Sequence, residues 1–311
     1  MQRRPRASCP MIMRTLALLA VVLAACGPAN SDPRRDDGRV KAPANATFTQ
    51  AQYDAHIAAL RKKLRAKKLG DMTVRIEDPF VVVGNGTQAD VARSAGTVRW
   101  AADRLERDFF AKRPDKILDV YLFDDAASYE RGVLALTGER PTTPYGFYSR
   151  ANGGLYMNIA TGGGTLVHEL VHPYVEADFD DAPAWLNEGL GSLFEQSADK
   201  GGHIVGLTNW RLSGLQERIA DGGGLPTFEQ LARMSDRAFY GAGSGTHYAM
   251  ARYLLYYLQE QGKLVAFYKQ FRAARDRDPS GYATLVSVLG EADMTAFQAR
   301  WETYVSALSF P

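Results

Sequence analysis

The segment His168-Glu169-Leu170-Val171-His172 constrains this chain more than any other, because it sets two histidines four residues apart with a glutamate between them. On a helix, positions i and i+4 lie on the same face, so His168 and His172 can direct their ring nitrogens at one metal ion. Glu169 can then reach a water bound to that metal without being a ligand itself. The motif therefore predicts a helix that carries a metal centre.

A third ligand for this metal is expected shortly downstream, in Trp185-Leu186-Asn187-Glu188-Gly189. Zinc prefers nitrogen and oxygen donors, and catalytic zinc sites supply three protein ligands and leave one position open. Glu188 is the natural third ligand beside His168 and His172. Zinc lowers the pKa of bound water to about 7, and Glu169 is placed to accept the proton. The residues predict a Zn²⁺-dependent hydrolase whose substrate is a peptide or protein.

The N-terminal residues predict a targeting segment. Arginines precede the apolar run from Leu16 to Ala25, which has the length of a signal peptide and is too short to span a bilayer. The run ends in Leu23-Ala24-Ala25-Cys26 and resembles the lipobox of bacterial lipoproteins. That resemblance implies that residues 1–25 are a signal peptide and that Cys26 is lipidated. An ordinary cleaved secretory signal is the alternative.

The lipoprotein resemblance also implies a location. The chain would sit in the bacterial cell envelope on the periplasmic side, held to the membrane by its N-terminal lipid anchor, and Gly27 after the cysteine favours the outer membrane. Cys9 lies in the removed segment, so the mature chain cannot form an internal disulfide. Loss of four arginines from the 37 basic residues leaves 33 against 35 acidic residues, a formal charge of −2. With no basic stripe, a nucleic-acid partner is not expected.

The remaining sequence predicts an α+β fold with two lobes. Residues 26–47 hold hardly any large apolar side chain and are expected to form a flexible tether. Residues 48–160 are expected to form an N-terminal α/β lobe with a small mixed sheet. Its predicted elements are helices over 48–68, 91–110 and 126–136, strands over 72–83 and 117–123, and an edge hairpin of 146–148 with 155–159 around an Asn-Gly turn.

Residues 161–311 are expected to form a mainly helical lobe that carries the metal motif. Thr165 is a plausible N-cap for the motif helix, and Pro173 should end or kink it. The active site is expected where the two lobes meet. Helices are predicted over 184–196, 208–220, 227–234, 245–261, 263–275, 281–288 and 292–307.

The metal motif together with Trp185-Leu186-Asn187-Glu188-Gly189 resembles the gluzincin metallopeptidases, closest to their peptidase-MA-like bacterial branch. The resemblance covers roughly residues 117–260 and implies a zincin-like fold, with Glu188 as the third ligand on the helix after the motif helix. Gly146-Phe147-Tyr148 resembles the edge strand that lies beside the substrate. The segment from Tyr248 resembles a later helix that faces the zinc.

Departures from the family pattern leave some roles open. Ser192 stands where the family often has an acidic partner for a histidine, so Asn187 and Glu195 are candidates for that role. Gly154-Leu155-Tyr156-Met157-Asn158 lacks the glutamate with which aminopeptidases of this group grip a free α-amine, which favours an endopeptidase.

Tyr248 and His247 are the candidate donors to the oxyanion that develops during hydrolysis, with core packing as the alternative role for Tyr248. Four other acids could compete for the metal: Glu176, Asp178, Asp180 and Asp181.

Two other functions are compatible with the sequence. One is a non-catalytic, metal-containing binding lipoprotein, which the presence of Glu169 disfavours, because a structural metal site needs no base. The other is a zinc hydrolase of a non-peptide amide.

Overall fold

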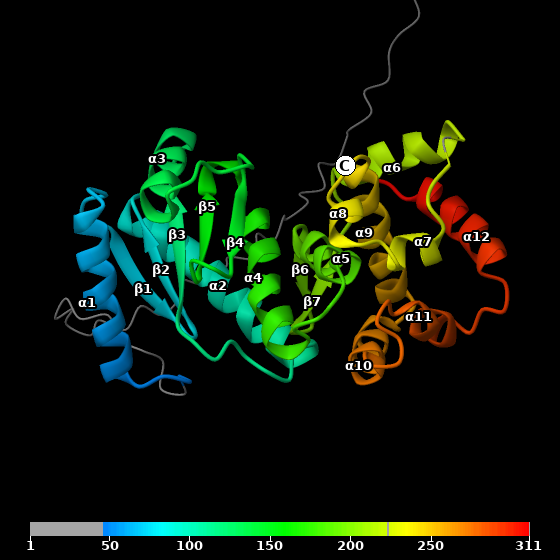
Figure 1. The fold of residues 1–311 in the computed structure, drawn as a ribbon, viewed down its shortest axis with the longest axis horizontal. Coiled ribbons are helices and arrows are strands. Elements are labelled where there is room, and N and C mark those ends of the chain that lie inside the picture. Colours follow the sequence, from blue (N-terminus) through cyan, green and yellow to red (C-terminus); the bar gives the residue numbers. More distant parts are fainter. Residues whose placement is uncertain (1–45, 223, 311) are drawn as a thin grey trace, which may run out of the picture. The chain divides into compact units, whose positions relative to one another are not determined.

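The computed structural model describes residues 46–222 and 224–310, all of which belong to one compact unit, Val40–Pro311. The expected signal peptide, the lipidation site Cys26 and nearly all of the expected tether therefore lie outside the described residues. No helix of the described part is long and apolar enough to cross a membrane. The unit mixes helices with a five-stranded mixed sheet, so the α+β class is confirmed (Figure 1).

The sheet has the strand order β1-β2-β3-β5-β4. β2 and β3, and β3 and β5, pair in parallel, whereas β1 and β4 run antiparallel at the two edges. The strands are β1 (Thr73–Glu77), β2 (Phe80–Gly84), β3 (Leu118–Phe123), β4 (Gly146–Ser149) and β5 (Gly154–Asn158). The predicted edge hairpin is confirmed as β4–β5.

Alternating side chains of the central strands bury both faces of the sheet. Val81 and Tyr121 face α1 (Gln50–Ala66) and α3 (Ala126–Thr137) in one apolar cluster. Val82 and Val120 belong to a second cluster that includes α2 (Gln88–Asp108) and α4 (Gly163–Asp178). The motif helix is thus packed against the sheet by its own apolar side chains.

Two predicted elements need correction. The strand expected over 72–83 is two antiparallel strands, β1 and β2, which turn at Asp78-Pro79. Pro79 has no N–H to donate to a sheet ladder, and the Asp78 carboxylate accepts bonds from the Thr47 N–H at 3.0 Å and the Tyr53 hydroxyl at 2.5 Å, which fixes the turn.

The motif helix α4 also differs from the prediction. Its N-cap is Gly162, so Thr165 lies inside the first turn, and the helix continues past Pro173 to Asp178. The missing backbone bond at Pro173 is offset by burial, because Tyr174 and Val175 are buried in the core. The Asp178 carboxylate is anchored by the Tyr268 hydroxyl at 2.9 Å.

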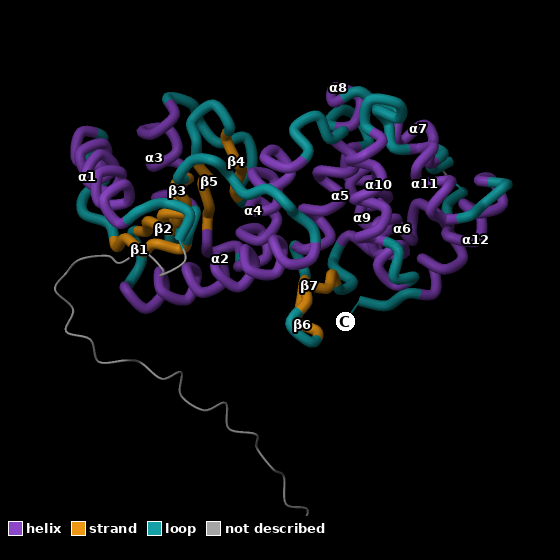
Figure 2. The backbone as a smooth tube through the Cα atoms, turned by 90° about the horizontal axis from the view of Figure 1, so that it is seen from below, coloured by secondary structure: helices purple, strands orange, loops and turns teal. Residues whose placement is uncertain are grey.

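The predicted helices after the motif are all present, although their ends shift by a few residues. They are α5 (Ala184–Phe194), α6 (Arg211–Ala220), α7 (Phe228–Ala232), α9 (Ser244–Glu260), α10 (Leu264–Ala274), α11 (Tyr282–Leu289) and α12 (Met294–Ala307). The prediction missed the short helix α8 (Asp236–Phe239) and the hairpin of β6 (Ser197–Lys200) and β7 (His203–Gly206). Figure 2 shows this hairpin apart from the main sheet.

Candidate active site

The candidate site lies between α4 and α5, which pack against each other. α4 supplies buried His168 and Glu169 and half-buried His172, and α5 supplies buried Glu188. α5 can approach closely because Gly191 has no side chain, and a Cβ there would lie 3.0 Å from the His168 ring. The spacing of the motif and this small residue together bring the four polar groups into one place.

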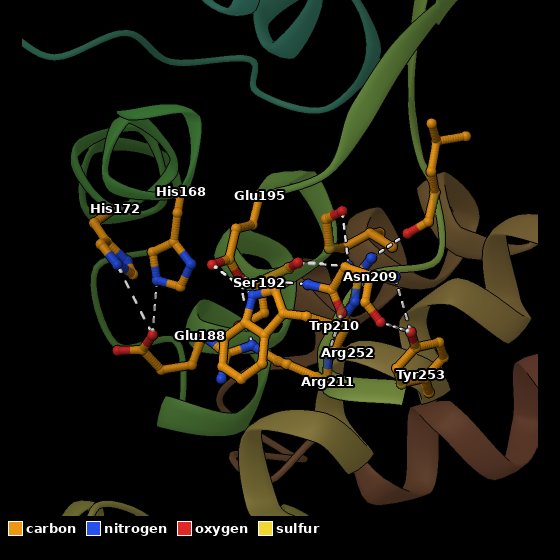
Figure 3. Close-up of polar contacts among 12 residues, drawn as sticks. His168, His172, Glu188, Ser192, Glu195, Asn209, Trp210, Arg211, Arg252 and Tyr253 are labelled. Atoms are coloured by element: carbon orange, nitrogen blue, oxygen red, sulfur yellow. Dashed lines mark hydrogen bonds and ion pairs between the residues drawn. The ribbon is translucent and has the colours of Figure 1, made fainter. Parts of the chain in front are cut away.

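The histidine rings converge on one carboxylate. Glu188 Oε2 lies 3.2 Å from His168 Nε2 and 3.9 Å from His172 Nε2 (Figure 3). Glu169 Oε2 lies 3.7 Å from His172 Nε2. His168, Glu169 and His172 also form a set whose ligand atoms all lie within 4.8 Å of one another. Two carboxylates therefore stand beside the same pair of imidazoles.

The two carboxylates differ in what else they touch. Glu169 Oε2 accepts a hydrogen bond from the backbone N–H of Tyr148 at 2.8 Å, which draws it toward β4. Glu188 Oε2 faces both imidazoles. Glu188 is therefore the carboxylate that could hold a metal together with both histidines, and Glu169 lies beside it. Two imidazole nitrogens and one carboxylate match the donors that zinc takes in open, three-ligand sites.

The site is electrostatically coupled. Burial opposes ionisation of Glu188, but the charge on His172 and the hydrogen bond with His168 outweigh it and lower the Glu188 pKa to about 2. Burial lowers the pKa of His168, but the hydrogen bond with Glu188 and the charge on Glu169 raise it more, so its pKa lies above the ordinary value. Glu188 and His168 therefore favour each other's charged form, and a divalent cation bound here would supply the positive charge that the carboxylate favours.

Asn187 orients one of the histidines. Its Oδ1 lies 2.9 Å from His172 Nδ1, so this nitrogen donates and Nε2 is left free to bind a metal. Glu195, the other candidate for this role, instead accepts bonds from the Arg211 guanidinium at 3.3 Å and the Trp210 indole at 3.4 Å. The Ser192 hydroxyl is buried and finds no partner within the described residues.

The structure separates the two predicted oxyanion donors. Tyr248 lines the cleft, and burial together with the charge on Glu188 raises its pKa. The His247 ring is buried behind the cleft wall, where Nδ1 lies 2.9 Å from the carbonyl oxygen of Phe239. The His247 ring bonds to the end of α8 and does not line the cleft, so the geometry favours Tyr248 over His247 as the donor.

The sequence prediction missed Tyr240. Its hydroxyl donates to Glu188 Oε1 at 2.8 Å, and its ring lies 6.3 Å from that of Tyr248. Burial and the charge on Glu188 raise the Tyr240 pKa, so the hydroxyl stays protonated and able to donate. The only signal in the sequence is its place before the glycine-rich stretch Gly241–Gly245, which is too weak to single it out.

A cleft of about 930 Å³ runs over these residues. Its floor is one face of α4, from Thr165 through His168 and His172 to Glu176, a length of about 16 Å at 1.5 Å per residue. One wall is β4, which pairs with β5 on one side only, so the Tyr148 N–H points into the cleft. The cleft continues past the histidines in both directions along α4.

The four competing acids have other partners than the two histidines. Glu176 accepts a bond from the Tyr148 hydroxyl at 2.9 Å, and Asp178 is buried against Tyr268. Asp180 and Asp181 are exposed and lie 3.4 and 3.5 Å from Arg275. None of these four acids pairs with His168 or His172 among the described residues, whereas Glu188 lies beside both rings.

No protein-family model matches the chain, and no curated protein matches it. The proposed function therefore rests on the geometry of the site.

Proposed function

We propose that this chain is a zinc-dependent endopeptidase of the zincin-like, gluzincin type. The observation that carries the proposal is the convergence of His168, His172 and Glu188, with Glu169 directly beside them. Zinc bound there would supply a water of lowered pKa and would polarise the carbonyl of the scissile bond. The fold around the motif, with an edge strand and a glutamate on the following helix, supports the gluzincin assignment.

The residues of the chain have distinct roles in this proposal. His168, His172 and Glu188 hold the metal, and Asn187 fixes the ring of His172. Glu169 accepts the proton of the attacking water and passes it to the leaving amine. Its carboxylate is already held in place by the Tyr148 N–H.

Two tyrosines are available to stabilise the charge that develops on the carbonyl oxygen. Tyr240 and Tyr248 both line the cleft and keep their protons, because burial and Glu188 raise their pKa values. A hydroxyl aimed at developing negative charge typically contributes about 3 kcal/mol to transition-state stabilisation. Tyr240 already donates to Glu188, so it needs only a change of acceptor to act in this way.

An endopeptidase is favoured because the cleft passes the histidines at both ends. Val175 and Glu176 line it beyond His172, and Thr165 lines it on the other side. An extended peptide can lie along the open edge of β4, which pairs with another strand on one side only. We further propose that the enzyme acts in the cell envelope, anchored through lipidated Cys26.

The test combines metal analysis with cleavage of a peptide library. We expect the purified protein to contain one zinc per chain and to lose cleavage in the presence of a chelator. The Glu169→Gln variant should keep its zinc and lose hydrolysis, whereas Glu188→Ala should lose zinc. Asp181→Asn, an exposed acid outside the site, serves as the control and should behave like the wild type.

Either of two results would contradict the assignment. Zinc lost together with activity in Glu169→Gln would make Glu169 a ligand. Unchanged zinc affinity in Glu188→Ala would require a different third ligand.

A further inference from the structure

Exposed aromatic side chains concentrate at the mouth of the cleft. Among the described residues, the large apolar side chains that remain exposed are Leu134, Tyr145, Leu207, Trp210, Tyr240 and Phe310. Tyr145, Trp210 and Tyr240 all line the cleft, with exposed fractions of 51%, 55% and 48%. Exposed apolar surface gathered in one place is typical of a binding surface.

Trp210 is held as a fixed platform. The Arg211 guanidinium lies 4.2 Å from the centre of its ring, and the indole N–H donates to Glu195 Oε1 at 3.4 Å (Figure 3). The same guanidinium lies 5.3 Å from the centre of the Tyr248 ring. A ring fixed in this way loses little conformational entropy when a ligand stacks on it.

The charges along the cleft, outside the metal centre, are paired within the protein. Arg211 pairs with Glu195 at 3.3 Å, and Arg150 pairs with Glu176 at 3.0 Å. A charged ligand group would have to break one of these pairs, so the cleft favours a neutral ligand.

Many of the other lining residues are hydroxylated. Phe147 and Phe179 also line the cleft, and only Val175 and Ala182 of the described lining residues are aliphatic. The hydroxyl-bearing residues that line it, besides its tyrosines, are Thr142, Thr143, Thr161, Thr165 and Ser244. An apolar side chain of a substrate would prefer an enclosed aliphatic pocket. A ligand with a flat C–H face and polar edges suits exposed rings set among hydroxyls.

We propose that the cleft binds a neutral saccharide unit, stacked on Trp210 with Tyr145 as a second contact. Sugar C–H groups would lie on the rings, and sugar hydroxyls would bond to the threonines. Combined with the proposed function, on which this step rests, the bond cut would be an amide of a glycosylated peptide. Binding of the sugar itself needs neither the metal nor Glu169.

The test measures binding of chitotetraose and cellotetraose to the full chain by isothermal titration calorimetry. Trp210→Ala should weaken binding about tenfold or more, Trp210→Phe should retain most of it, and Tyr145→Ala should cause a smaller loss. Phe310→Ala, an exposed aromatic away from the cleft, is the matched control and should bind like the wild type. Melting curves of each variant would show that the fold is kept.

The outcomes separate this inference from the proposed function. The inference is overturned if neither oligosaccharide binds, if Trp210→Ala binds like the wild type, or if a proline-rich peptide shows the Trp210 dependence instead. Peptide cleavage by the same protein would then leave the endopeptidase proposal intact. Trp210-dependent sugar binding without any chelator-sensitive hydrolysis would support the saccharide site and contradict the hydrolase.

Discussion

Asn187 is the residue whose role is most directly open to test. Its Oδ1 accepts from His172 Nδ1 at 2.9 Å, and partners of this kind typically contribute 10- to 100-fold to metal affinity. We expect Asn187→Leu, which removes the acceptor but keeps the size, to weaken zinc binding about tenfold or more. Competition with a chromophoric chelator measures the affinity.

The control for this prediction is Asn187→Asp, which keeps an acceptor at the same place and should bind zinc at least as tightly as the wild type. Wild-type affinity in Asn187→Leu would show that the orientation of His172 is set by something else.

Among individual residues, local spacing predicted that the two histidines share a direction but did not predict which of the candidate donors lines the cleft. His168 and His172 are one helical turn apart, so their common direction follows from the sequence alone. His247 and Tyr248 are neighbours on α9, and successive helical residues point about 100° apart, so only one of them can face the cleft. The packing of α8 determines which of these two residues faces the cleft, and it also brings Tyr240 beside Tyr248. No local sequence pattern encodes this packing.

Gly189 shows why a small residue follows Glu188 in α5. An added Cβ would lie 2.9 Å from the Leu255 side chain and 3.3 Å from the backbone of Ala251, so α5 and α9 touch here. Gly214 in α6 has nothing within 4 Å of that position. We expect Gly189→Ala to destabilise the protein by about 1 kcal/mol or more through overpacking. Gly214→Ala should stabilise it by about 0.5–1 kcal/mol through helix propensity.

Urea unfolding of the two alanine variants checks these opposite signs, and zinc content shows whether moving α5 disturbs Glu188. If both substitutions stabilised the protein to a similar degree, the contact between α5 and α9 would have space for an additional methyl group.

At the scale of elements, helices with a clear apolar face were predicted well, whereas elements fixed by distant contacts were not. β6 and β7 are short, and the segment Ser197–Gly206 has little apolar alternation. Their hairpin is held by α2, about 95 residues earlier, through bonds such as the one from Arg107 to the Gly202 carbonyl at 2.7 Å. In the same way, α4 runs past Pro173 because tertiary burial of the next turn outweighs the lost backbone bond.

At the scale of the whole unit, this hairpin ties the helical part to the sheet-bearing part. The buried Asp108 carboxylate of α2 accepts the backbone N–H of Ile204 at 3.0 Å and pairs with His203 at 2.7 Å. Asp108→Ala would leave a buried N–H unpaired and should cost about 1–3 kcal/mol of unfolding free energy. Asp199 also binds α2, through Arg104, but it is more exposed, so Asp199→Ala should cost less than Asp108→Ala.

Chemical unfolding of both aspartate variants tests this difference. If Asp199→Ala proved the more costly substitution, the exposed pair and not the buried carboxylate would hold the hairpin.

The pH dependence of global stability should carry a contribution from Glu77. Its side chain on β1 is only 8% exposed, although Arg99 lies 3.1 Å away. Burial raises the Glu77 pKa to about 7, more than Arg99 and Arg75 lower it. Below the unfolded-state pKa of about 4.5, both states hold the proton and Glu77 carries no penalty. As the pH rises from there to 7, the unfolded state ionises first, so folding loses stability, and above 7 the loss is constant.

Glu77→Gln removes this titration while keeping a hydrogen-bond acceptor for Arg99. We therefore expect the free energy of unfolding of the variant to exceed that of the wild type by about 1–2 kcal/mol at pH 8. This figure is smaller than the full pKa shift would give, because Arg99 is largely exposed to solvent. The gain should shrink steadily as the pH falls toward 5, because the wild-type carboxyl is then protonated when folded. Urea unfolding of both proteins across this range measures the difference, and a gap independent of pH would mean that Glu77 ionises at its ordinary pKa in the folded chain.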